Sequence, residues 1–411
     1  MTGQAMKTTV GNPYRELFAA PGTTGFALAG LLARLPLPMT GIGIITLLAQ
    51  VRGSYALAGA VAATFVLTYA LVSPQVSRLV DRQGQRRVLP MATGISVIGL
   101  LLLLGGSWYH APVALLFVGA LLAGAMPSLS AMVRARWTAL YRGQPRLQTA
   151  YSLETVFDEV TFIAGPPLSV GLAVSLFPQA GVLAAAMLLP IGVFALVAQR
   201  RTEPPIEAVP STGEHSGSVI GLASVRWLAL LMVAMGVIVG TIDIVSVAYA
   251  AQLGQPAAAS LVLSAYAAGS CLSGVLFGAL KLKAPLHRLV LLGGMATALT
   301  TVPLLLVGSI GSLVATVLVA GAFFAPTMIV AMSLIEQQVP ARQLTEGMTW
   351  LLAALNVGVA LGAAMSGYGV DAYGTRAGFL LAVTAGGAVL LAAVVAYRQL
   401  RPRDDRNLGE G

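Results

Sequence analysis

Four acidic residues lie within long apolar stretches of the sequence, where a charged side chain is unusual. Glu154, Asp158 and Glu159 belong to one stretch, and Asp243 belongs to a later one. Arg34 lies near the middle of the first stretch. Ionisable groups in such surroundings are costly to bury and usually take part in moving protons or bound ions. These five residues are therefore the candidates for coupling a proton to a substrate.

The spacing of the three clustered acids places them on two different faces of a helix. Glu154 and Asp158 are four residues apart and share one face of a helix, whereas Glu159 points about 100° away from Asp158. Two like charges on one desolvated face cannot both stay ionised at low cost. A carboxyl that takes up a proton near neutral pH suits a proton carrier. Alternatively, the acids only hold helices together by pairing with nearby arginines: Arg34, Arg134 and Arg136.

Arg34 precedes two prolines, Pro36 and Pro38, which lack backbone donors and should bend or break the helix. An arginine at this depth needs a carboxylate partner, and the stretch that contains Glu154 supplies candidates. An arginine that instead faced a cavity would bind an acidic or zwitterionic molecule. The sequence leaves both alternatives open.

The composition indicates which elements position these residues. The chain has 411 residues, of which 57% are hydrophobic and 9% charged, with a mean hydropathy of +0.84. Soluble domains carry roughly 25% charged residues. A soluble, disordered or nucleic-acid-binding protein is therefore not expected, despite the net charge of +9. The sequence predicts an integral membrane protein with the lipid bilayer as its partner.

Twelve segments are long enough to cross a bilayer as helices, which takes about 20 apolar residues. Each is apolar all round rather than with a period of two, so we expect an all-α polytopic protein and no barrel. The predicted spans are 23–49, 55–76, 88–107, 111–133, 149–175, 179–198, 225–250, 257–280, 287–307, 311–334, 347–370 and 375–397.

The distribution of basic residues predicts the orientation. If both termini are cytoplasmic, 21 of the 24 lysines and arginines fall on the cytoplasmic side, and only Arg52 and Arg376 fall outside. Such asymmetry follows the positive-inside rule. Short loops and abundant Ala, Gly, Leu and Arg favour a prokaryotic host, so we expect the inner (cytoplasmic) membrane.

A polar segment after the sixth span divides the chain into six plus six helices. We expect a six-helix bundle at 1–198, a cytoplasmic loop at 199–222 and a second bundle at 223–411. Parallel six-helix halves with a substrate site between them are a common transporter plan. One cysteine and three separated histidines leave little for a metal or other cofactor to bind, so none is expected.

The loop between the second and third spans resembles the signature of the major facilitator superfamily, with Ser77 in place of the usual glycine and Gln85 in place of a basic residue. The resemblance implies alternating access and a cytoplasmic charge network that stabilises the outward-open state. Gly84 would permit the tight turn. The residues implied for this network are Asp81, Arg82, Arg86 and Arg87. The alternative is that these charges only orient the chain in the membrane.

The fifth span contains Gly165 and Pro166, which resemble the fifth-helix motif of drug/proton antiporters. Thr161 and Val170 depart from that motif, and Ala120 stands where many such antiporters carry an arginine. The resemblance implies a monomeric secondary transporter that exports small amphipathic or drug-like molecules in exchange for protons.

A proton-coupled importer or a uniporter of a polar nutrient or organic anion is the alternative. A regulatory or receptor role on the same fold also stays open. No Walker motif is present, so ATP does not drive this chain. An enzyme is not expected, because the spans contain no nucleophile–histidine pair, metal-ligand set or diphosphate motif.

Overall fold

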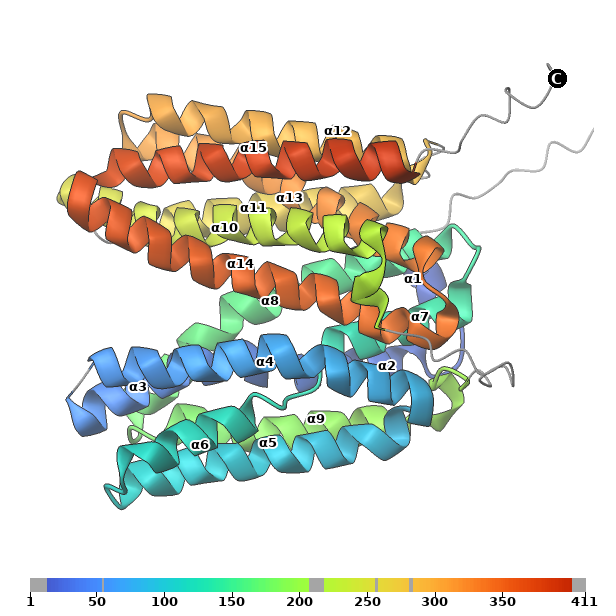
Figure 1. Cartoon of the computed structure of the whole chain (residues 1–411), viewed down its shortest axis with the longest axis horizontal. Helices are drawn as coiled ribbons and strands as arrows, with labels where there is room; N and C mark the ends of the chain where they lie inside the picture. The colour runs from blue at the N-terminus through green and yellow to red at the C-terminus, as the bar shows by residue number, and fades with distance from the viewer. Residues whose placement is uncertain (1–12, 54, 207–217, 256–257, 281–283, 401–411) are drawn as a thin grey trace, which may run out of the picture.

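The computed structural model of the chain describes residues 13–53, 55–206, 218–255, 258–280 and 284–400, and every regular element among them is a helix (Figure 1). Lys7, Lys281, Lys283, the arginines after residue 400 and residues 207–217 of the predicted loop lie outside this part. The first group of helices is α1 Pro13–Leu17, α2 Thr23–Arg34, α3 Pro36–Arg52, α4 Tyr55–Gln83, α5 Gln85–Trp108, α6 Val113–Ala123, α7 Leu129–Tyr141, α8 Arg146–Ser175 and α9 Ala180–Ala198. The second group is α10 Ala223–Gln252, α11 Ala258–Ala279, α12 Leu286–Thr301, α13 Ile310–Gln338, α14 Leu344–Tyr373 and α15 Thr375–Leu400.

Each of the twelve predicted spans lies on one helix or on two consecutive ones, which confirms the all-α polytopic fold. Within the described residues, ten helical segments are long and apolar enough to cross a membrane. The fourth span, made of α6 and α7, is not among these ten. Neither is α8, which has 30 residues but contains Glu154, Asp158 and Glu159.

The first span breaks where its prolines predict. Helix α2 ends at Arg34 and α3 begins at Pro36, with Leu35 between them. Because Pro36 and Pro38 have no N–H, the carbonyls one turn earlier lose their helical partners. The break leaves Arg34 in the last turn of α2, where a cation interacts favourably with the helix dipole.

The fourth span differs from the prediction of one helix over 111–133. It consists of α6 and α7, separated by residues 124–128, and it extends to Tyr141. Pro127 explains the interruption, since proline disfavours helical geometry in the residue before it and donates no hydrogen bond. Gly124 at the end of α6 lies against α4, where an added Cβ would meet the Thr68 Cβ at 2.5 Å.

Helices of the first group pack mainly against one another, and so do those of the second. We call the two groups the N-half (residues 13–206) and the C-half (218–400). They meet through α4 against α14 and through α8 against α11 and α13 (Figure 1). We call the end of the bundle that holds α1 and the last turn of α15 the terminal end, and the other the opposite end.

The hydrogen bonds that join the halves gather towards the terminal end in the described part of the chain. The Ser77 hydroxyl lies 2.7 Å from that of Thr349. The Thr149 hydroxyl donates to the Gly278 carbonyl (2.6 Å), and Arg142 pairs with Glu336 (3.1 Å). The bond nearest the middle of the helices joins Glu159 to Ser270 (2.9 Å). The terminal end is therefore closed in this structure.

Candidate functional site

The intramembrane acids fall into two groups with different surroundings. Glu154 and Asp158 lie in a buried cluster with arginines of the N-half, as the pairing alternative predicted. Glu159 and Asp243 lie outside that cluster and form no ion pair with any described residue. The structure thus separates acids that the sequence places together on one helix.

Arg34 is the centre of the buried cluster. Its guanidinium forms ion pairs with Glu154 and with Asp158, the latter at 2.8 Å, and also donates to the Glu154 carbonyl at 3.3 Å. Only 4% of Arg34 is exposed. The predicted carboxylate partner of this arginine is therefore confirmed, and it comes from α8. Gly30, one turn earlier, allows α2 to approach α7, since an added Cβ would lie 2.4 Å from Val133.

Helix α7 completes the cluster with three side chains. Arg134 pairs with Asp158 at 2.7 Å, and Ser130 donates to the same carboxylate at 2.5 Å. The Trp137 indole N–H donates to Glu154 at 2.8 Å. Two cations and two anions leave no net charge, and their mutual attraction offsets part of the free-energy cost of burying all four.

Sequence reasoning named Arg134 as a possible partner but missed Ser130 and Trp137. These three residues are spaced four and three apart, so they share one face of α7. That spacing was a usable signal. Arg136, the other arginine considered, points elsewhere: it donates to the Gln85 side chain at 2.7 Å and to the Gln199 carbonyl at 2.8 Å.

Glu159 points from α8 towards the C-half. It is half-buried and accepts a hydrogen bond from the Ser270 hydroxyl of α11 at 2.9 Å. It lies within electrostatic reach of Asp243 on α10, and both acids reach Tyr266. Asp243 is exposed, and no hydrogen bond or ion pair to a described residue holds its carboxylate. The two acids thus belong to different halves, and no cation among the described residues pairs with either of them.

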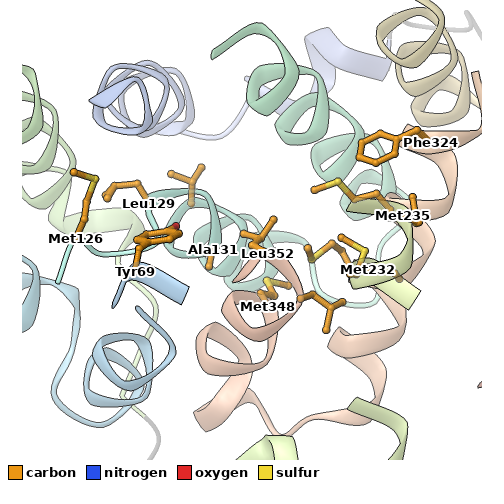
Figure 2. Close-up of a cluster of buried hydrophobic side chains, with 14 of the residues drawn as sticks. Tyr69, Met126, Leu129, Ala131, Met232, Met235, Phe324, Met348 and Leu352 are labelled. Carbon is orange, nitrogen blue, oxygen red and sulfur yellow. The ribbon is translucent and has the colours of Figure 1, made fainter. Parts of the chain in front are cut away.

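Apolar side chains from both halves form one buried cluster. Figure 2 shows Tyr69, Met126 and Leu129 of the N-half at one side of a buried cluster that continues into α14, α10 and α13. The C-half members drawn there are Met232, Met235, Phe324, Met348 and Leu352. Methionine is unbranched and adapts its shape to its neighbours. The contact between the halves is therefore apolar and adaptable.

The signature loop binds the C-half through Asp81. Its carboxylate accepts the backbone N–H groups of Thr345 at 3.3 Å and Glu346 at 2.9 Å, in the first turn of α14. These N–H groups have no partner within the helix, and the helix dipole favours a negative charge there. Gly84 has φ +84°, a conformation that glycine adopts without strain.

The three arginines of the loop are not arranged as the resemblance implied. Arg82, Arg86 and Arg87 are exposed and form no ion pair within the described ranges, because Asp81 is turned towards α14. Arg86 donates its backbone N–H to Glu203 at 2.8 Å.

Each of the two residues that depart from the family signature makes a specific side-chain contact. Ser77 supplies the hydroxyl that meets Thr349 across the halves. Gln85 accepts from Arg136, where a basic residue would repel that guanidinium. In the fifth span, Gly165 packs against Pro38, whose Cγ lies 2.8 Å from the position of an added Cβ. Gly165 thus brings α8 to the break between α2 and α3, and Pro166 follows it inside a continuous helix.

No metal-binding group of three or more His, Cys, Asp or Glu side chains occurs in the described part of the chain. The carboxylates of the described residues can exchange protons and bind cations by electrostatic attraction.

Comparison with known proteins gives one family and several solved structures. The Major Facilitator Superfamily profile matches residues 26–254 and 227–411. No curated protein matches the sequence. A bacterial homologue of the iron transporter ferroportin, solved in an outward-facing state, has 17% identity and a TM-score of 0.72 over 92% of this chain and 98% of its own.

Two further structures share the fold. The E. coli fucose:proton symporter has 14% identity and a TM-score of 0.68, covering 90% of this chain and 98% of its own. The human organic anion transporter MFSD10 has 16% identity and a TM-score of 0.66, covering 93% and 99%. At these identities the likeness establishes the fold and leaves the transported molecule open.

Proposed function

Since the chain belongs to the major facilitator superfamily of secondary transporters, we propose that it exports small amphipathic, drug-like molecules with a cationic group in exchange for protons. The observation that carries this proposal is the pair formed by Glu159 and Asp243. These carboxylates come from different halves, reach each other electrostatically and have no cation partner among the described residues.

Exchange follows from competition for the same two carboxylates. An ionised carboxylate attracts a cation, and a protonated one does not. Binding of a proton therefore weakens binding of a cationic molecule, and the reverse holds as well. The adaptable Met and Phe side chains of the buried cluster between the halves would suit an apolar body attached to that cation.

The two acids that form ion pairs with arginines, Glu154 and Asp158, have a structural role in this proposal. Glu154 and Asp158 are neutralised by Arg34 and Arg134, and the cluster is buried within the N-half. Protonating either acid would leave an arginine without its counter-charge, which is costly at this depth. Arg34 is also too occupied to bind an acidic substrate, so the importer or uniporter of an organic anion has no comparable support.

Alternating access would use the contacts at the terminal end. We place both termini and the terminal end in the cytoplasm of a cell with an inner membrane, so this conformation would be closed on its cytoplasmic side. The bundles at 1–198 and 223–411 would then rock about the site as a monomer, joined by the loop at 199–222. Asp81 would stabilise this closed state by capping α14.

Proton flux in proteoliposomes tests this function. Vesicles would hold a pH-sensitive dye, and pools of cationic dyes, antibiotics, sugars and organic acids would be added in turn. We expect only cationic amphipathic compounds to trigger proton movement. Glu159→Gln and Asp243→Asn should each reduce it to the level of empty vesicles.

A peripheral carboxylate provides the matched control. Glu16 is 47% exposed and pairs with Arg146, so Glu16→Gln should leave the flux unchanged. Counterflow of a labelled compound without proton movement would overturn the antiport proposal and identify a uniporter.

A further inference from the structure

An open cavity at the terminal end is lined by arginines that the proposed transport cycle does not use. It lies between the turn that joins α4 to α5 and the first residues of the loop between the halves, and its volume is about 560 Å³. The residues that line it are Gln83, Gly84, Arg86, Arg87, Arg200, Glu203, Pro204 and Ile206.

The charge of this cavity favours an anion. Three guanidinium groups face one carboxylate, and that carboxylate is engaged with the Arg86 backbone N–H at 2.8 Å. Arg86, Arg87 and Arg200 are exposed and form no ion pair across the described stretches. The planar guanidinium group matches the geometry of phosphate oxygens and binds them through paired hydrogen bonds.

The cavity also lies beside an apolar surface. Leu79 is one turn before Gln83 on α4, and Met91 is one turn after Arg87 on α5, so each shares a helix face with a cavity residue. Leu79 is 37% exposed and Met91 52% exposed. Ile206, in the cavity wall, is 56% exposed. This arrangement of exposed apolar side chains next to arginines matches the boundary between the acyl chains and the head groups of a bilayer.

We propose that this cavity binds a phosphate group, supplied by the head group of an anionic lipid. Basic pockets on the cytoplasmic side of membrane proteins attract such head groups, and each arginine near the surface contributes to the attraction. The exposed apolar residues would contact the acyl chains of the same lipid. A zwitterionic lipid carries a compensating cation on its head group and would bind more weakly.

Native mass spectrometry of the full chain in detergent tests the proposal. The probes are phosphatidylglycerol, phosphatidylcholine and inorganic phosphate. The cavity variant is Arg87→Gln with Arg200→Gln. The control is Arg226→Gln with Arg398→Gln, which removes two exposed arginines at the same end and outside the cavity. Melting temperatures equal to wild type show that both variants fold.

We expect phosphatidylglycerol to bind in preference to phosphatidylcholine, and its affinity to fall roughly tenfold or more in the cavity variant. The control variant should bind it as wild type does. Equal phosphatidylglycerol affinity in the two variants would overturn the site. Binding of inorganic phosphate at the cavity without binding of phosphatidylglycerol would overturn the lipid as its source.

Discussion

Both halves bring helices together at glycines, but the described N-half adds a buried ion cluster and the described C-half does not. In the N-half, α2, α7 and α8 are tied by the buried ion cluster around Arg34. In the C-half, α10 and α14 cross at glycines on both helices. An added Cβ at Gly236 would lie 2.2 Å from the Leu355 carbonyl oxygen, and at Gly358 it would lie 2.1 Å from that of Val233. Such small residues let helix backbones touch without polar groups.

This contrast shows which acids the architecture requires. The N-half depends on Glu154 and Asp158, because its arginines would otherwise be unpaired. Glu159 lies on the same helix but forms no ion pair with the arginines of that cluster among the described contacts. The helices of the C-half are held together by side-chain and backbone packing. Asp243 makes no hydrogen bond or ion pair with a described residue, so we assign it no structural role. In the proposed cycle, the acids without a cation partner among the described residues are the ones that exchange a proton.

Removing Arg34 should have the largest effect on stability. Arg34→Met leaves Glu154 and Asp158 with one cation for two anions, and breaking a buried pair costs about 3–5 kcal/mol. We expect strong loss of monodisperse protein and a lower melting temperature in detergent.

The double variant Arg34→Gln with Glu154→Gln removes one charge of each sign. It should recover most of the melting temperature, because the remaining Arg134 and Asp158 stay paired. An equally unstable double variant would show that charge balance is not what holds the N-half together.

A bulky residue at the glycine crossing should be the next most damaging change. Gly358→Val places side-chain atoms against the backbone of α10, and overpacking costs about 1–3 kcal/mol. Gly367 on the same helix has no neighbour within 4 Å, so Gly367→Val is the matched control. Thermal denaturation compares them. If both variants melt alike, the C-half does not depend on this crossing.

Loss of the unpaired acid in the C-half should weaken binding without weakening the fold. Asp243→Asn removes a charged partner of a cationic amphipathic compound such as ethidium, and we expect about tenfold weaker binding. Its melting temperature should match that of wild type, unlike Arg34→Met. Fluorescence titration measures the affinity, with Glu16→Gln as control. A large fall in melting temperature would give Asp243 a structural role.

The smallest effect is expected at the contact between the halves. Thr149→Val removes the hydroxyl that satisfies the Gly278 carbonyl, which costs about 1 kcal/mol. Opening of the terminal end should become about fivefold more frequent. The alkylation rate of Ser152→Cys, in a Cys271→Ser background, measures how often the terminal end opens. Ser152 is buried against Gly278, so a cysteine there reacts only when the halves separate.

Thr64→Val, which removes a hydroxyl bonded within its own helix, serves as control for that measurement. A rate unchanged by Thr149→Val would show that this bond does not hold the terminal end closed.

The sequence was sufficient for the positions of most helices, because apolar length is a property of each segment alone. It also predicted the break before Pro36 and the pairing of Arg34 with α8. It missed the break in the fourth span, which we predicted as one helix over 111–133 and in which α6 ends before Pro127. It could not separate Glu159 from Asp158, because that distinction depends on which neighbouring helix each side chain meets. Arg134 comes from the preceding helix, whereas Ser270 lies 111 residues further along the chain than Glu159.

The most direct test of the central claim is the reaction of the membrane-embedded protein with dicyclohexylcarbodiimide, which modifies protonated carboxyl groups in apolar surroundings. Peptide mass spectrometry would locate the modified residues near neutral pH. We expect modification of Glu159 and Asp243, reduced by a bound cationic compound, and none of Glu154 or Asp158. Modification of Glu154 or Asp158 with Glu159 left intact would contradict it, and would place the exchangeable proton in the arginine cluster.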